Sequence, residues 1–256
     1  MSVLIAGDIH GEYDALHRQI SPKDTLILLG DYLDFIDYDN LSGMIAEFVP
    51  REVIERVLGL IAGEQLDQAK REMESAAFSM GDLFDKLQES AHLRYERLFA
   101  GIPCETYLIY GNVDFPKILK EHLRPNTNLI EASALTLQGK RCGFVSGIPS
   151  MKYSFGMPGE FSREEYRKRL YGIGSVDHLF VHPPPAIPDL SFDTDAGRDE
   201  EGSEDLLAYI KAYFPKTVYF GHVHKPRKTE MEFEEKTQLI NAGYFRKTCK
   251  LLTLEL

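Results

Sequence analysis

Five short apolar runs lie along the chain, and each of them is followed directly by a glycine or a histidine. The runs cover residues 2–6, 26–29, 107–110, 179–181 and 218–220. Runs of this length that are apolar throughout, rather than alternating with polar residues, are typical of strands buried on both faces of a sheet. The pattern therefore predicts an α/β protein whose buried strands end in tight turns.

Helical spacing of apolar residues dominates the long segment between the second and third runs. Residues 51–99 carry apolar side chains three and four positions apart and contain few turn residues, which predicts two or three amphipathic helices. We interpret residues 41–100 as a helical insertion in a single domain that spans residues 1–256. The insertion could pack on the sheet, cover a functional site or form a contact between copies of the chain, and the sequence leaves these roles open.

Antiparallel strands are expected in the second half of the chain. A hairpin is predicted over residues 134–146, with its turn at Gly139-Lys140. The tail alternates between apolar and polar residues, which predicts strands over residues 231–241 and 247–256.

Two further helices have recognisable start signals. Residues 189–205 hold eight acidic residues and a single basic one, a composition typical of a solvated loop. Ser203 is expected to cap a helix over residues 204–213 that follows this loop. Asp114 is expected to cap a helix over residues 115–123, which has Pro116 in its first turn.

Composition restricts the class of protein. The chain has 256 residues, of which 43% are hydrophobic and 27% charged, as in a soluble protein with a sizeable core. Charged residues interrupt every apolar stretch well short of the about 20 residues that a membrane span needs. The net charge of −11 argues against a protein that coats nucleic acid, although bound cations would still allow a small phosphorylated substrate.

The cysteines Cys104, Cys142 and Cys249 are far apart, so we expect reduced thiols and a cytoplasmic location.

Side chains that bind metal ions follow all five predicted strands. In chain order they are Asp8 with His10, Asp31, Asn112, His182, and His222 with His224. Ligands of open α/β sheets bind beyond the carboxyl ends of the strands, so we expect these side chains to meet at one place. Carboxylate, amide and imidazole donors without thiolate suit ions such as manganese, iron and zinc, and the set suffices for two ions that share one carboxylate. A lone Gly-Asp is usually only a turn, so the prediction depends on the five strand ends together.

The ordered blocks GDIHG, GDYLD, GNVD, VHPP and GHVH resemble the calcineurin-like metallophosphoesterase superfamily. The blocks span residues 7–224 and leave out only the helical insertion and the two ends of the chain. The resemblance implies an α/β/β/α sandwich of the metallophosphoesterase type, in which two sheets pack face to face and helices cover the outer faces. It also implies a metal centre at the strand ends between the two sheets.

The resemblance assigns a role to each candidate ligand. Asp8, His10 and His224 would hold one divalent ion, Asn112, His182 and His222 would hold a second, and Asp31 would bridge both. Manganese is favoured, with iron, zinc, nickel and cobalt as alternatives. A water or hydroxide between the ions would attack phosphorus, and His10 is the imidazole that could assist the chemistry.

Two positions depart from the family's usual pattern. Many members have a histidine after the asparagine of the third block, where it contacts the phosphate or protonates the leaving group, but this chain has Val113. The usual carboxylate partner of that histidine is retained as Asp34, either as a vestige or as a group that orients a water. A phosphodiester depends less on a general acid, so we predict a phosphodiesterase that acts on a small phosphorylated substrate.

Phe35 stands where protein phosphatases of the superfamily have a phosphate-binding arginine, which argues against a protein phosphatase. Cationic contacts to the substrate are therefore expected from elsewhere. The candidates are Lys152, Arg198, Lys225, Arg227 and Lys228.

Other functions remain open at the level of sequence. One is a phosphomonoesterase or nucleotide pyrophosphatase of the same superfamily. Another is a catalytically weak metal-binding scaffold whose partners bind the helical insertion, which is also the candidate surface for a homo-oligomer. The intact ligand set favours the enzyme, because a scaffold does not need two ions with open positions.

Overall fold

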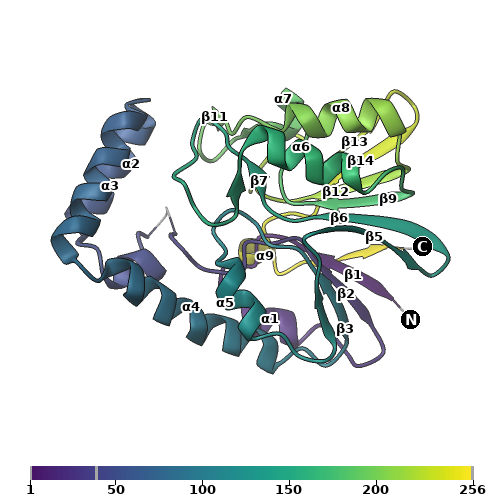
Figure 1. Cartoon of the computed structure of the whole chain (residues 1–256), viewed down its shortest axis with the longest axis horizontal. Helices are drawn as coiled ribbons and strands as arrows, with labels where there is room; N and C mark the ends of the chain where they lie inside the picture. Colours follow the sequence, from purple (N-terminus) through teal and green to yellow (C-terminus); the bar gives the residue numbers. More distant parts are fainter. Residues whose placement is uncertain (1, 38–39, 255–256) are drawn as a thin grey trace.

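Two β-sheets packed face to face form the centre of the molecule (Figure 1). The computed structural model describes residues 2–37 and 40–254. The first sheet has the strand order β15-β1-β2-β3-β4, in which β1 to β4 run parallel and β15 pairs antiparallel with β1. Its strands are β1 (Val3–Ala6), β2 (Thr25–Leu28), β3 (Glu105–Leu108), β4 (Thr127–Leu129) and β15 (Leu252–Leu254).

The second sheet has the order β13-β14-β12-β9-β6-β5. Its four inner strands run parallel, and the edge strands β13 and β5 are antiparallel to their neighbours. The strands are β5 (Ala132–Leu137), β6 (Lys140–Val145), β9 (His178–Val181), β12 (Thr217–Phe220), β13 (Glu230–Phe233) and β14 (Thr237–Asn241). Two small pairs lie outside both sheets, namely β7 (Ile148–Pro149) with β8 (Glu160–Phe161), and β10 (Phe192–Asp193) with β11 (Arg198–Asp199).

Helices cover the outer face of each sheet, which confirms the predicted α/β/β/α sandwich (Figure 1). On the first sheet these are α1 (Tyr13–His17), α4 (Leu83–Ala100) and α5 (Pro116–Glu121), and on the second they are α6 (Arg163–Gly172) and α8 (Glu204–Tyr213). Short turns of helix are η1 (Met44–Glu47), α7 (Pro188–Ser191) and α9 (Phe245–Thr248). Among the residues that the structure describes, none of the helices combines the length and apolar character needed to cross a bilayer.

The strands are apolar throughout because each of their faces meets a different core. In β1, Val3 and Ile5 belong to the cluster between the sheets, whereas Ala6 belongs to the cluster under the outer helices. In and just after β2, Ile27 and Leu29 face the other sheet, and Leu26 and Leu28 face the helices. Successive side chains of a strand point to opposite faces, so both sets must be apolar.

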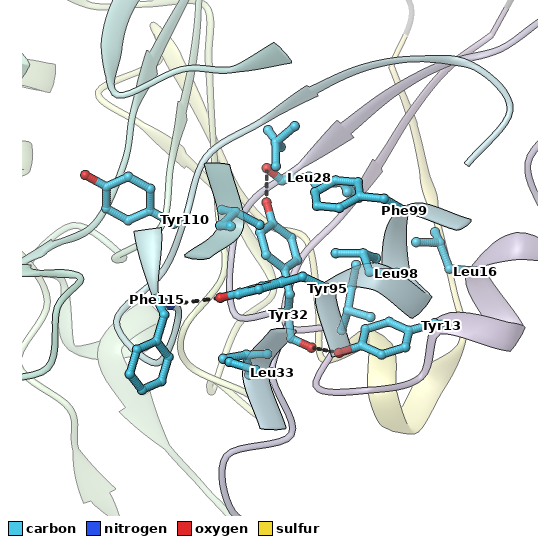
Figure 2. Packing of buried hydrophobic residues seen from close by; sticks show 14 of the residues in the cluster. Tyr13, Leu16, Leu28, Tyr32, Leu33, Tyr95, Leu98, Phe99, Tyr110 and Phe115 are labelled. Carbon is cyan, nitrogen blue, oxygen red and sulfur yellow. Dashed lines mark hydrogen bonds between the residues drawn. The ribbon is translucent and has the colours of Figure 1, made fainter. Parts of the chain in front are cut away.

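The helical segment between β2 and β3 has two parts that pack differently. Helix α4 lies in the core under the first sheet, where Tyr95, Leu98 and Phe99 contact the residues around Tyr32 (Figure 2). Helices α2 (Arg51–Ala62) and α3 (Leu66–Met80) pack on each other and extend to the left of the sheets in Figure 1. We call residues 51–80 the arm.

Most local predictions agree with the structure. The hairpin β5–β6 turns between Leu137 and Lys140, and Ser203 caps α8 by accepting a hydrogen bond from the Leu206 N–H at 3.1 Å. The strand predicted over residues 247–256 was wrong in its first part, because α9 forms there and only Leu252–Leu254 pairs with β1. Residues 255–256 lie outside the described residues.

Candidate metal centre

The seven candidate ligands meet beyond the carboxyl ends of parallel strands from both sheets. Asp8 and His10 follow β1, Asp31 follows β2, and Asn112 follows β3. His182 follows β9, and His222 and His224 follow β12. The carboxylate and imidazole groups form two sets of neighbouring ligand atoms, Asp8 with His10 and His224, and Asp31 with His182 and His222.

The first set is a carboxylate facing two imidazoles. His10 Nε2 lies 3.1 Å from His224 Nε2. Asp8 Oδ1 lies 4.0 Å from His10 Nε2 and 3.8 Å from His224 Nε2. These three atoms face a common point, as the ligands of one ion do.

The second set includes the amide oxygen of Asn112. That oxygen lies 3.1 Å from His182 Nε2 and 3.0 Å from His222 Nδ1. Asp31 Oδ2 lies 3.3 Å from His182 Nε2 and 3.8 Å from His10 Nε2, so this carboxylate stands between the two sets.

Backbone carbonyls fix the direction in which two of the imidazoles point. His10 Nδ1 lies 2.8 Å from the Leu33 carbonyl, and His182 Nδ1 lies 2.8 Å from the Leu29 carbonyl. A carbonyl only accepts, so each Nδ1 carries a proton and donates it. Each Nε2 is thereby left to face the other candidate ligands, which is the usual outer hydrogen bond of a metal-binding histidine.

The titrating groups of the centre are strongly perturbed in opposite directions. Burial raises the pKa of Asp8 to about 7 and lowers the pKa of His222 to about 4. Burial alone would lower the pKa of His182, but the Asp31 carboxylate outweighs it and raises that pKa to about 9. In the metal-free protein a proton on His182 thus supplies positive charge among buried carboxylate and imidazole groups. The donor set consists of nitrogen and oxygen only and would accept divalent cations in that position.

The backbone of this centre is held in an uncommon conformation. Asp8, His10, Asp31 and His222 have φ angles of 52°, 42°, 53° and 70°. Each such residue costs on the order of 1–3 kcal/mol, and such residues cluster at functional sites. The neighbouring glycines provide room, because a Cβ on Gly111 would overlap Asp31 Oδ1 and a Cβ on Gly221 would overlap Asp8 Oδ2.

Asp114 holds the Asp31 turn and does not cap a helix, so the capping prediction was wrong. Its buried carboxylate accepts hydrogen bonds from the backbone N–H groups of Asp31 (2.8 Å), Tyr32 (3.0 Å) and Gly111 (2.9 Å). Helix α5 begins at Pro116, and no side chain caps it. Burial, together with the nearby Asp31, raises the pKa of Asp114 to about 6.

Asp193 plays a similar part for the turn that carries His224. It is buried, and its Oδ2 accepts from the N–H groups of His224 at 3.1 Å and Lys225 at 3.4 Å. The expectation of a wholly solvated loop over residues 189–205 is therefore corrected, since this segment forms α7, β10 and β11 and buries one of its acidic residues. Asp193 was missed because one acidic residue among eight has no distinguishing signal in the sequence.

Asp34 lies beside Gly11 but is engaged by an arginine of the helical insertion. Arg94 of α4 reaches both of its carboxylate oxygens, with Nη2 3.2 Å from Oδ2 and Nε bonded to Oδ1. The same guanidinium lies 2.6 Å from Glu47 Oε1. Val113 contributes its backbone N–H, 3.2 Å from Asp31 Oδ1, and no titrating side chain.

A ligand cluster at the strand ends of a two-sheet sandwich defines a class of α/β protein with a candidate metal centre between its sheets. The family model of the calcineurin-like phosphoesterases matches residues 53–226, and the chain belongs to that family. The matched region contains Asn112, His182, His222 and His224, while Asp8, His10 and Asp31 precede it. Membership implies metal-dependent hydrolysis of phosphoesters and the binding of divalent metals.

Solved structures resemble the chain in fold at low sequence identity. One crystal structure is 15% identical with a TM-score of 0.63, over 99% of this chain and 98% of its own. The crystal structure of the protein TT1561 of Thermus thermophilus is 13% identical with a TM-score of 0.53, over 99% and 98% of the two chains. No curated protein matches the sequence.

Proposed function

We propose that this chain is a dinuclear metal-dependent phosphodiesterase that acts on a small phosphorylated substrate. The observation that carries the proposal is the position of Asp31 Oδ2, 3.3 Å from His182 Nε2 in one ligand set and 3.8 Å from His10 Nε2 in the other. A carboxylate between two sets of nitrogen and oxygen donors suits a pair of ions that share one ligand.

Asp8, His10 and His224 would hold one ion, Asn112, His182 and His222 would hold the other, and Asp31 would contact both. The chemistry that such a pair supplies when bound is an activated water nucleophile and positive charge for the phosphoryl oxygens. Manganese is the ion to test first, because nitrogen and oxygen donors without thiolate accept it.

The chain's own hydrogen bonds keep these side chains in place. The His222 N–H lies 3.0 Å from each oxygen of Asp8, and the Val113 N–H donates to Asp31. The carbonyls of Leu33 and Leu29 hold His10 and His182. Ligands fixed in this way need little rearrangement during the reaction, which is the condition for efficient electrostatic stabilisation.

The environment of Val113 supports a diester rather than a monoester as substrate. Val113 has no proton to give to a leaving oxygen, and Asp34 is paired with Arg94. A positioned general acid is typically worth about 10²–10⁴-fold in rate, and an activated diester with a good leaving group depends on it least.

The test is hydrolysis by manganese-loaded protein of matched bis(p-nitrophenyl) phosphate and p-nitrophenyl phosphate, with cyclic dinucleotides and a nucleotide pyrophosphate alongside. We expect two manganese ions per chain and a higher kcat/KM for the diester than for the monoester. The Asp31→Asn protein should lose metal and at least about 100-fold in kcat/KM, more than the usual loss for an outer-sphere partner. Full activity in that variant, or a wild-type preference for monoesters, would contradict the proposal.

Val113→His extends the same test. The new imidazole should raise the ratio of monoester to diester kcat/KM, by less than the full effect of a general acid because Arg94 already occupies Asp34. Val113→Leu is the control and should leave the ratio unchanged.

A further inference from the structure

The cationic residues that the sequence offers as substrate contacts are engaged elsewhere. Arg227 stacks on the Phe192 ring, with 3.9 Å from its guanidinium carbon to the ring centroid. The others form ion pairs: Lys225 with Asp195 (2.6 Å), Lys228 with Asp189 (2.7 Å), Lys152 with Glu64 (3.0 Å) and Arg198 with Glu200 (2.7 Å). A different cation should therefore face the phosphoryl group.

Arg246, in α9, lies against the turn that carries Asp8 and His10. Its backbone N–H donates to the Asp8 carbonyl at 3.2 Å, and its Nη1 donates to the His10 carbonyl at 3.2 Å. The guanidinium thus lies directly against the backbone of His10, a candidate ligand of the first set.

The guanidinium of Arg246 has donors to spare. Within the described residues it donates through Nη1 to His10 and through Nη2 to Asp37 Oδ2 at 2.8 Å, whereas an arginine carries five N–H donors. Its side chain is 20% exposed, so a solute can reach it. Arg94, by contrast, has all three of its nitrogens bonded to Asp34, Glu47 and Ser90.

Tyr244 fixes the segment from which Arg246 projects. Its ring stacks on His224 at 3.8 Å between centroids and 6° between planes, and it meets the edge of His10 at 5.7 Å. The segment 244–246 therefore borders the first ligand set, and it carries an aromatic ring and a guanidinium two positions apart.

We propose that Arg246 contacts an anionic oxygen of the substrate's phosphoryl group beside Asp8, His10 and His224. This inference rests on the proposed phosphoesterase function. The planar guanidinium fork matches two oxygens of a phosphate, which a lysine does not reproduce. Arg246 thereby supplies the cationic contact that Phe35 cannot provide.

The rival role for Arg246 is purely structural, as a clamp that holds the His10 turn to Asp37. Calorimetry of inorganic phosphate binding to manganese-loaded protein distinguishes the two roles. Metal content, thermal midpoint, KM and kcat are measured on the same proteins. The variants are Arg246→Gln and Arg246→Lys. Arg97→Gln is the matched control, since it also removes an arginine that is paired with a carboxylate, here Asp14 of α1 at 2.7 Å.

We expect Arg246→Gln to retain two manganese ions while its phosphate affinity falls, and its diester KM rises, by about tenfold or more, as for loss of a charged hydrogen bond. Arg246→Lys should recover part of this loss, and Arg97→Gln should behave as wild type. Unchanged phosphate affinity and KM, or losses that follow loss of metal in both Arg246 variants, would overturn the inference.

Phosphate affinity and diester turnover also separate this inference from the proposed function. A wild-type protein that binds phosphate through Arg246 but hydrolyses no diester would refute the proposed function and leave the contact standing. A wild-type protein that hydrolyses diesters, but whose phosphate affinity is unchanged by Arg246→Gln, would refute the inference about Arg246 and leave the proposed function standing.

Discussion

Tyr95 connects the helical insertion to the candidate ligand Asp31 by way of the Asp114 carboxylate. Its hydroxyl donates to Asp114 Oδ1 at 3.2 Å and accepts from the Phe115 N–H at 2.8 Å, the second of which is drawn in Figure 2. Asp114 in turn accepts from the Asp31 N–H. The side chain is fully buried, so no water can replace these partners at low cost.

We expect Tyr95→Phe to destabilise the protein by about 1–3 kcal/mol, the usual cost of leaving buried hydrogen-bonding groups without a partner. It should also weaken manganese binding by about tenfold or more, as changes in groups that support metal ligands do. The measurements are denaturant unfolding and metal titration. Tyr209→Phe is the control, since its hydroxyl donates to the Gly174 carbonyl in the other core and should affect stability alone. Equal metal affinity in wild type and Tyr95→Phe would contradict this role.

At the scale of residues, the sequence predicted side chains with a fixed place relative to a strand end. Asp8, Asp31 and Asn112 each follow a glycine after an apolar run, and that pattern can be read directly from the sequence. Arg94 and Tyr244 carry no such mark. Arg94 reaches Asp34, and Tyr244 reaches His224, from segments whose positions depend on tertiary packing, so only the folded chain identifies them.

At the scale of elements, the strands were predictable because burial on both faces requires runs without polar residues. The division of the insertion into a core helix and an arm was not, since α2 and α4 both show a helical apolar stripe. The stripe of α4 faces the sheet, whereas α2 packs mostly on α3. Periodicity gives the face of a helix that is buried but does not name its partner.

The arm is the element that the candidate centre should not need. Its contacts with the rest of the chain include the ion pair of Glu64 with Lys152 and the packing of Ile54 in the core under the first sheet. No candidate ligand lies in residues 51–80. An exposed ion pair adds about 0–1 kcal/mol, so Ile54 is the larger contribution to stability, at about 1.5–3 kcal/mol.

Replacing residues 51–80 with a short Gly-Ser linker should therefore lower the thermal midpoint by several degrees and leave two manganese ions bound. Ile54→Ala in the full chain is the matched control, because it removes packing but keeps the arm. A difference in diester KM between the two proteins would then measure what the arm contributes to substrate binding. Loss of metal from a folded, truncated protein would show that the arm supports the centre.

At the scale of the whole molecule, the candidate centre joins the two sheets. Four of the seven ligands follow strands of the first sheet, and three follow strands of the second. Elsewhere the sheets meet through apolar side chains such as Ile5, Phe144 and Phe180. In the metal-free protein the strand ends lower the stability of this interface, because carboxylates are buried there and the backbone has left-handed φ angles.

Metal binding should therefore stabilise the entire sandwich. An ion at 100 times its dissociation constant adds about 2.7 kcal/mol to the stability of a one-site protein. A domain of this size gains about 2–4 °C in thermal midpoint per kcal/mol, so removal of metal with EDTA should lower the midpoint by about 5–10 °C. Adding manganese back should restore it, whereas the Asp31→Asn protein should respond to neither treatment. An unchanged midpoint in a wild-type protein that demonstrably exchanges two ions would mean that the two sheets are held together without help from the centre.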